Sequence, residues 1–146
     1  MRRSAALVAA VVVVLSCATA CGDDYVSLRA GECLPASAEV VGTREPDPPT
    51  VSCATAHRYE VYGVGRLSGT ATFPGEAVVD PAARQVCYAL FESGVGFPPT
   101  EKPTGTKVVY LAPTESSWND DHDREVECLL VFDKDHVGRL GRPTSA

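Results

Sequence analysis

Residues 125–132, with the sequence EVECLLVF, decide the fold that we expect for this chain. The side chains on one face of this stretch are apolar, and they are Val126, Cys128, Leu130 and Phe132. Such a pattern is typical of a strand with a buried face, because successive side chains point to opposite sides of a sheet. We therefore expect residues 125–132 to form the longest strand, with Cys128 facing the core.

The clearest helix is expected over residues 81–93. Asp80 can cap its start, and Pro81 suits the first helical position, where no backbone donor is needed. Gly94 is placed to end the helix. One stripe of the helix carries Ala83, Cys87, Leu90 and Phe91. Because this stripe is apolar, Cys87 should point into the core, where a cysteine on a strand can reach it.

Three further strands are expected elsewhere. Alternating β-branched and aromatic residues, bounded by turn residues, indicate strands at residues 50–53, 58–67 and 107–111. In the second of these, one face carries Tyr59, Val61, Gly63 and Gly65. Its other face carries Glu60, Tyr62, Val64 and Arg66. The two glycines would permit a bulge or close packing against another element.

Turns and loops occupy the rest of the domain. Proline, glycine and charged residues indicate exposed loops at residues 42–49, 68–75 and 94–105. A turn centred on Gly31 is expected within residues 28–34. The stretch 113–123 around Trp118 is expected to be irregular.

The first twenty residues have the form of an export signal. Two arginines precede an apolar run over residues 5–15, which is shorter than the ~20 residues of a bilayer span but suits a signal-peptide core. Residues 18–22 (ATACG) resemble a bacterial lipobox, in which the thiol of Cys21 is acylated. We therefore expect a signal peptide over residues 1–20 and a lipid anchor at Cys21. Cys17 could head a competing box, and cleavage without acylation would secrete the protein.

The remaining chain has the size of one domain. Removal of the signal leaves 146 − 20 = 126 residues, which we divide into a lipidated cysteine with a short tether (21–27), an extracytoplasmic domain (28–140) and a tail (141–146). Two arginines leave with the signal, so the formal charge becomes 11 − 19 = −8. An acidic body argues against nucleic acid or anionic lipid as the main partner.

Four cysteines belong to the folded part of the chain, namely Cys33, Cys53, Cys87 and Cys128. In a small exported domain they indicate two disulfides. Their spacings of 20, 34 and 41 residues lack the close pairs of a zinc site. Loop-closure entropy leaves all three connectivities open, because each ring would contribute roughly 3–5 kcal/mol. The expected fold is a small, disulfide-stapled α+β domain of about four strands, with one main helix packed on the sheet.

Three stretches carry a family resemblance, namely residues 31–34 (GECL), 51–62 (VSCATAHRYEVY) and 113–118 (PTESSW). With Asp123, Arg124 and Cys128, they resemble the septum formation family of actinobacterial envelope proteins over about residues 28–133. The chain departs from the family pattern at Glu32, Leu34, Ala56 and an acidic insertion at 120–122. The resemblance implies a link to cell division. Together with the expected elements, it favours the pairs Cys33–Cys53 and Cys87–Cys128.

Four side chains are candidates for binding, namely His57, Glu60, Tyr62 and Trp118. In a functional interpretation His57 is a ligand or hydrogen-bonding group whose tautomer Glu60 fixes. The structural interpretation, which we favour, has His57 and Trp118 bracing the disulfide and the loops. The acidic residues 120–123 are interpreted as a solvated loop rather than a cation site, and an EF-hand count from Asp133 fails, so no metal is expected.

No catalytic motif is recognisable in the chain. It lacks the Gly-x-Ser-x-Gly element, a phosphate-binding loop and a dinucleotide fingerprint, so neither an enzyme nor a cofactor is expected. The leading hypothesis is a non-catalytic envelope lipoprotein, an interaction module whose partner is an envelope or division protein or the cell wall. An exposed patch with Tyr62 or Trp118 would support it. The rivals are a wall-directed hydrolase or transferase using His57 with Glu60, and a small-molecule-binding sensor.

Overall fold

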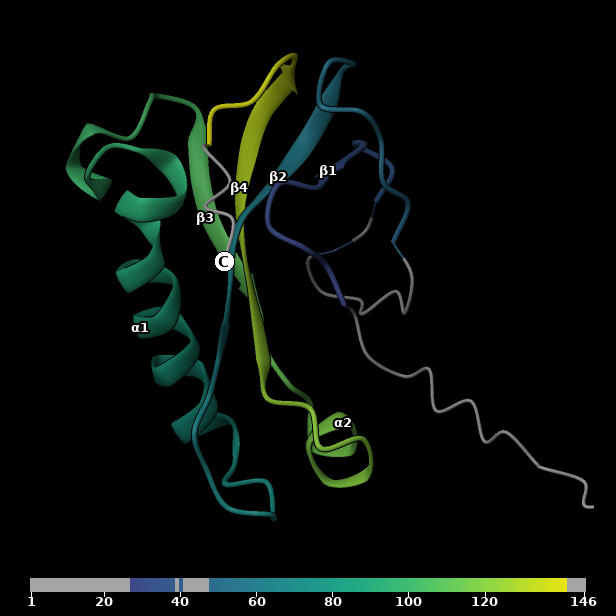
Figure 1. Ribbon diagram of the computed structural model, residues 1–146, viewed down its shortest axis with the longest axis vertical. Coiled ribbons are helices and arrows are strands. Elements are labelled where there is room, and N and C mark those ends of the chain that lie inside the picture. Colours follow the sequence, from purple (N-terminus) through teal and green to yellow (C-terminus); the bar gives the residue numbers. More distant parts are fainter. Residues whose placement is uncertain (1–26, 39, 41–47, 142–146) are drawn as a thin grey trace, which may run out of the picture.

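The computed structural model describes residues 27–38, 40 and 48–141 as one antiparallel sheet with a long helix on one face. The strands are β1 (Cys33–Leu34), β2 (His57–Arg66), β3 (Thr106–Leu111) and β4 (Glu125–His136). The helices are α1 (Glu76–Val95), the short 3-10 helix η1 (Pro99–Glu101) and α2 (Glu115–Asp120). The spatial order is β1-β2-β4-β3 (Figure 1). The expected α+β fold with four strands and one main helix is confirmed.

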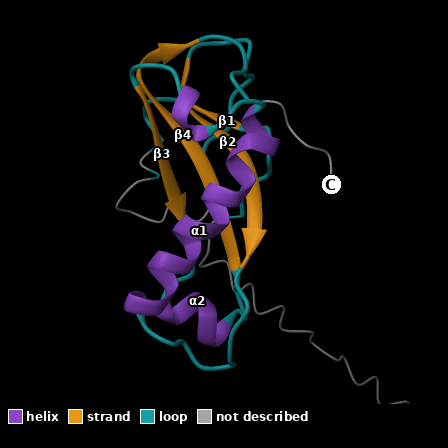
Figure 2. Ribbon diagram, turned by 90° about the vertical axis from the view of Figure 1, so that its left-hand side faces the viewer, coloured by secondary structure: helices purple, strands orange, loops and turns teal. Residues whose placement is uncertain are grey.

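Strand β4 lies in the middle of the sheet because it pairs with both β2 and β3. Its residues 126–130 are all buried, since both faces of the sheet are covered. Helix α1 crosses one face diagonally (Figure 2), and the segment that begins at Leu28 covers the other.

Two apolar clusters fill these two layers. The cluster under α1 includes Tyr62, Val79, Ala83, Cys87, Phe91, Val126, Cys128 and Leu130. The cluster on the opposite face consists of Leu28, Leu34, Ala38, Val40, Val61, Leu111 and Leu129. Burial of apolar surface on both sides of β4 therefore stabilises its central position.

Helix α1 is longer than the sequence pattern predicts. It begins at Glu76 instead of Pro81, which lies in its second turn. A proline there removes only a hydrogen bond to the Ala77 carbonyl in the first turn, and burial of Val79 favours the extra residues. Gly94 does not end the helix, which continues to Val95. A Cβ at Gly94 would lie 2.2 Å from the Tyr62 carbonyl oxygen, so the glycine permits close packing of α1 on β2.

A bulge changes the faces of β2. The register with β4 shifts between Val61 and Gly63, so Tyr62 is an extra residue. As a result Val64 joins Tyr59 and Val61 on the face away from α1, whereas Gly63 packs against α1. The expected strict alternation is therefore wrong after Val61. The expected bulge or close packing at the glycines is confirmed.

Two other expectations need correction. The strand expected at residues 50–53 is reduced to a single bridge between Val51 and Cys33, and β1 lies where a turn was expected. The stretch expected to be irregular contains α2, whose capping box links Thr114 and Ser117. A six-residue helix is too short to show a helical period, so its cap was the only available signal.

The structure forms one disulfide between Cys87 of α1 and Cys128 of β4, and a second between Cys33 of β1 and Cys53. These are the two pairings that the sequence favours. Among the described residues, no helix is long and apolar enough to cross a membrane. The proposed signal peptide, Cys17, Cys21 and residues 142–146 of the tail lie outside the described residues.

Candidate functional site

His57 lies at the start of β2 with an imidazole that is only 1% exposed. Its Nδ1 is 2.8 Å from the Thr55 carbonyl oxygen, so the neutral ring carries its proton on Nδ1 and donates it to that carbonyl. The rings of Phe132 and His136 approach edge-on, with centroids 5.9 and 5.5 Å away. Nε2 is buried and has no hydrogen-bond partner among the described residues.

Glu60, also 1% exposed, binds the end of the described chain. Its carboxylate accepts hydrogen bonds from the backbone N–H groups of Leu140 at 2.9 Å and Gly141 at 2.8 Å. We call residues 137–141 the C-terminal strap. The strap is also tied down by the Gly138 N–H, which donates to the Cys53 carbonyl at 2.7 Å. Glu60 thus holds a segment that is distant in sequence against the sheet.

The Cys33–Cys53 disulfide completes this region, and we call Cys33, Cys53, His57 and Glu60 the corner cluster. Ligand-type atoms of Cys33, His57 and Glu60 all lie within 4.8 Å of one another. The tautomer of His57 is held by Thr55 rather than by Glu60, in contrast to the functional interpretation of the sequence. While the disulfide is intact, its sulfurs are not thiolate ligands for a metal ion.

Tyr62 does not belong to an exposed patch, so it gives the interaction hypothesis no support. Its side chain is 1% exposed, packs edge-on against Phe91, and donates a hydrogen bond to the Cys87 carbonyl at 2.9 Å. Burial raises the pKa of the Tyr62 phenol above its ordinary value. The phenol therefore braces α1 against the sheet.

Trp118 is equally buried and braces loops instead of presenting a surface. The indole Nε1 donates to the Thr70 carbonyl at 3.1 Å, and the Arg124 guanidinium lies 3.6 Å above the ring. Phe73 contacts the ring edge-on. These contacts agree with the structural role that the sequence favours for Trp118.

Most of this chain matches the model of a known protein family. The family model described as septum formation matches residues 15–128, which include both disulfides, His57 and Glu60. This chain belongs to the septum formation family. Its membership suggests a role related to septum formation, and the disulfides fit an extracytoplasmic location. Searches of curated proteins and of solved structures gave no match.

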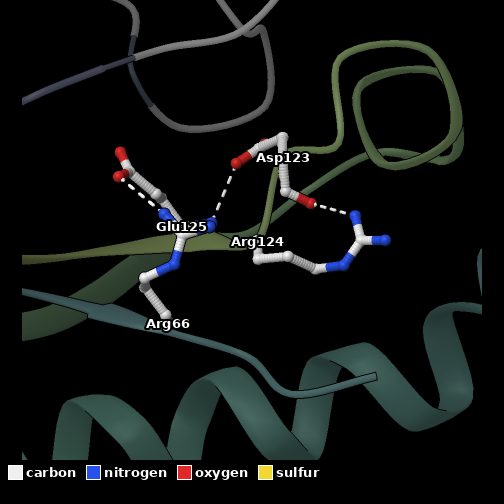
Figure 3. Close-up of polar contacts among 4 residues, drawn as sticks. All are labelled: Arg66, Asp123, Arg124 and Glu125. Atoms are coloured by element: carbon white, nitrogen blue, oxygen red, sulfur yellow. Dashed lines mark hydrogen bonds and ion pairs between the residues drawn. The ribbon is translucent and has the colours of Figure 1, made fainter. Parts of the chain in front are cut away.

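The acidic loop at residues 120–123 of this septum formation domain contacts the start of β4 through Asp123. The Asp123 carboxylate accepts from the Glu125 N–H at 2.8 Å and from the Ser117 hydroxyl at 3.0 Å. Figure 3 shows the bond from the Glu125 N–H to the Asp123 carboxylate, together with the Arg66–Glu125 ion pair and the bond from Arg124 to the Asp123 carbonyl. Among the described residues, the corner cluster is the only place where three potential metal ligands converge, so the loop forms no such site there.

A surface hollow lies away from the corner cluster, between the start of α1, the end of β3 and the start of α2. Its apolar lining includes Phe73, Val79 and Leu111. Its acidic lining consists of Glu76, Asp80 and Glu115. Sequence analysis missed this hollow, because its walls come from three segments that only the fold brings together.

Proposed function

We propose that this protein is a non-catalytic lipoprotein that acts as an interaction module in septum formation outside the cytoplasmic membrane. The observation that carries the proposal is the family match over residues 15–128, which spans nearly all of the folded domain. The anchor would be Cys21, because acyl chains on this residue would hold the acidic domain at the membrane.

A non-catalytic role is supported by the surroundings of His57 and Glu60. A hydrolase or transferase needs its acid–base groups in a cleft that substrate can enter. Both side chains are buried, and the Glu60 carboxylate already accepts two backbone hydrogen bonds from the strap. The arrangement favours a structural use of both groups over general acid–base chemistry on the cell wall.

The partner surface would lie on the outer side of α1. Protein interfaces usually centre on an aromatic side chain, and Tyr62 and Trp118 are unsuitable because they are buried. Tyr88 of α1 is 71% exposed and is the most exposed of the large hydrophobic side chains that the structure describes. We therefore propose that Tyr88 is the central contact residue for an envelope or division protein.

Localisation in dividing cells tests the proposal. We expect the unsubstituted protein to be enriched at the septum and Cys21→Ala to lose membrane association. Tyr88→Ala should keep its membrane association and lose septal enrichment. Val108→Ala, which changes an exposed apolar residue on β3, away from α1, should keep both. An even distribution of the unsubstituted protein would overturn the proposed link to the septum. Septal enrichment of Tyr88→Ala would overturn only the contact surface.

The hollow beside α1 favours small-molecule binding as a second candidate function. Its apolar walls and three carboxylates suit a cationic, partly apolar ligand. Screening wall-derived amines against the full chain by thermal shift would test it, with Glu115→Gln as the matched variant. A shift that is unchanged in that variant would contradict binding in this hollow.

A further inference from the structure

We propose that the corner cluster becomes a zinc site when its disulfide is reduced. The ligands would be the thiolates of Cys33 and Cys53, the Nε2 atom of His57 and the carboxylate of Glu60. Two sulfurs, one nitrogen and one oxygen form a donor set that tetrahedral zinc accepts. Cys53, His57 and Glu60 lie close together in sequence, whereas only the pairing of β1 with β2 brings Cys33 to Glu60.

The distances place the donors near coordination geometry. One ring nitrogen of His57, the Cys33 sulfur and a Glu60 carboxylate oxygen lie within 4.8 Å of one another, and the disulfide joins Cys53 to Cys33. Around a tetrahedral zinc with Zn–S bonds of about 2.3 Å, two thiolates lie about 3.8 Å apart and the other donors slightly closer. Breaking the S–S bond would let the two sulfurs move apart to that separation, and the Cys33, His57 and Glu60 donors would have to approach one another by about 1 Å to complete the site.

His57 supplies an independent observation in favour of a ligand. Its Nε2 is buried without a hydrogen-bond partner among the described residues, which leaves an acceptor unsatisfied. Its Nδ1 is held by the Thr55 carbonyl. Metal-binding histidines typically show this arrangement, in which one nitrogen is fixed by a carbonyl so that the other presents its lone pair to the ion.

The strap orients the Glu60 carboxylate and leaves lone pairs of its oxygens available for a metal ion. A carboxylate has about four lone-pair sites, and the N–H groups of Leu140 and Gly141 occupy two of them. The same two bonds fix the carboxylate beside His57. In the zinc form they would act as supporting contacts behind the ligand.

The two disulfides differ in how readily a reductant can reach them. Cys53 is partly exposed and lines a surface hollow with Ser52 and Arg139, whereas Cys87 and Cys128 are both buried. A dithiol would attack Cys53 Sγ, form a mixed disulfide there and release Cys33 as a thiolate. The second thiol of the reductant would then displace Cys53 and close a cyclic disulfide. Zinc binding to the resulting pair releases any thiol protons that remain.

Metal titration of the full chain tests the proposal. Cys17→Ser and Cys21→Ser are introduced throughout, so that only the four cysteines of the fold remain. The chain is reduced with dithiothreitol and desalted without oxygen, and a peptide map verifies that the buried Cys87–Cys128 bond persists. We expect the reduced chain to bind one Co²⁺ with thiolate-to-metal absorption and to exchange it for Zn²⁺. The oxidised chain should bind neither ion.

Single variants separate the proposed ligands. His57→Ala should weaken zinc binding by at least about tenfold, and Glu60→Gln should also weaken it. His122→Ala, which changes a histidine outside the corner cluster, should leave the affinity unchanged. The proposal is overturned if the reduced chain binds no metal, if it unfolds in the presence of Zn²⁺, or if His57→Ala binds as tightly as the unsubstituted chain.

Discussion

The two disulfides place the same bond in opposite surroundings. Cys87–Cys128 joins α1 to β4 inside the larger apolar cluster. Cys33–Cys53 joins β1 to the loop before β2, beside two buried polar side chains and the strap. The two disulfides therefore have different roles. Cys87–Cys128 supports the packing of α1 on the sheet, whereas Cys33–Cys53 holds a polar region together and is partly exposed at Cys53.

Removal of the Cys87–Cys128 disulfide should cause the largest loss of stability. With a sequence separation of 41, the entropy model assigns Cys87–Cys128 about 4 kcal/mol, against about 3 kcal/mol for Cys33–Cys53 with a separation of 20. We expect the double variant Cys87→Ala/Cys128→Ala to be the less stable of the two alanine pairs in urea denaturation. The reverse order would show that the corner region carries more of the stability than the core.

Removal of the Glu60 carboxylate should open the corner and leave the core in place. Glu60→Ala leaves the Leu140 and Gly141 N–H groups without their acceptor, and we expect a loss of about 3 kcal/mol. Hydrogen exchange at these two amides should accelerate before exchange in β4 does. Asp133→Ala, which removes an exposed carboxylate paired with Lys107, should cost less than about 1 kcal/mol. Equal effects of the two substitutions would contradict a special role for Glu60.

Close packing on the core side can be tested at Gly94. The Cβ of Gly94→Ala would collide with the Tyr62 carbonyl, and overpacking of this kind should cost about 2 kcal/mol. Ser93→Ala, at the preceding exposed position, should change stability by less than about 0.5 kcal/mol. If urea denaturation shows no loss for Gly94→Ala, α1 can move away from β2 more freely than the comparison assumes.

The smallest effect is expected at Tyr62, which links α1 to the core. Tyr62→Phe removes the hydrogen bond to the Cys87 carbonyl and should cost about 1 kcal/mol at neutral pH. Because burial raises the pKa of the Tyr62 phenol, the folded state holds this proton more tightly than the unfolded state. The corresponding stability is complete below about pH 10 and declines at higher pH, by at most about 1.4 kcal/mol per pH unit.

The difference in free energy of unfolding between the unsubstituted protein and Tyr62→Phe should therefore shrink as the pH rises above about 10. Because the other tyrosines are present in both proteins, this difference reports on Tyr62 alone. Stability measured by urea denaturation across this range checks the prediction. A constant difference would mean that the phenol ionises as easily in the folded domain as in the unfolded chain.

Sequence reasoning reached much of the fold where local pattern and burial agree. Strand β4 and the Cys87 stripe of α1 were predictable, because their apolar side chains repeat with the periods of a strand and a helix. The pattern underestimated the length of α1. Pro81 favours a helix start, but the packing of Val79 in the core extends the helix back to Glu76. It also missed β1, a two-residue strand that exists only through its pairing with β2.

Of the four candidate binding residues, only His57 and Glu60 belong to the corner cluster. His57 and Glu60 lie close enough in sequence to be grouped, and the family resemblance includes both residues. Their partners were not predictable from sequence, because the Leu140 N–H that binds Glu60 is 80 residues away. Tyr62 and Trp118 were candidate binding residues, and the structure buries both side chains. Their burial was not predictable from residue type, because side-chain type does not reveal which face of the fold is covered.

The sequence by itself thus determined the family, the cysteine set and the elements whose side-chain period matches their burial. The tertiary structure alone decided the position of the bulge at Tyr62, the strap on Glu60 and the convergence of Cys33 with His57. The physical reason is that periodicity is a property of neighbouring residues, whereas a buried polar group is satisfied by whichever distant donor the packing brings within about 3 Å.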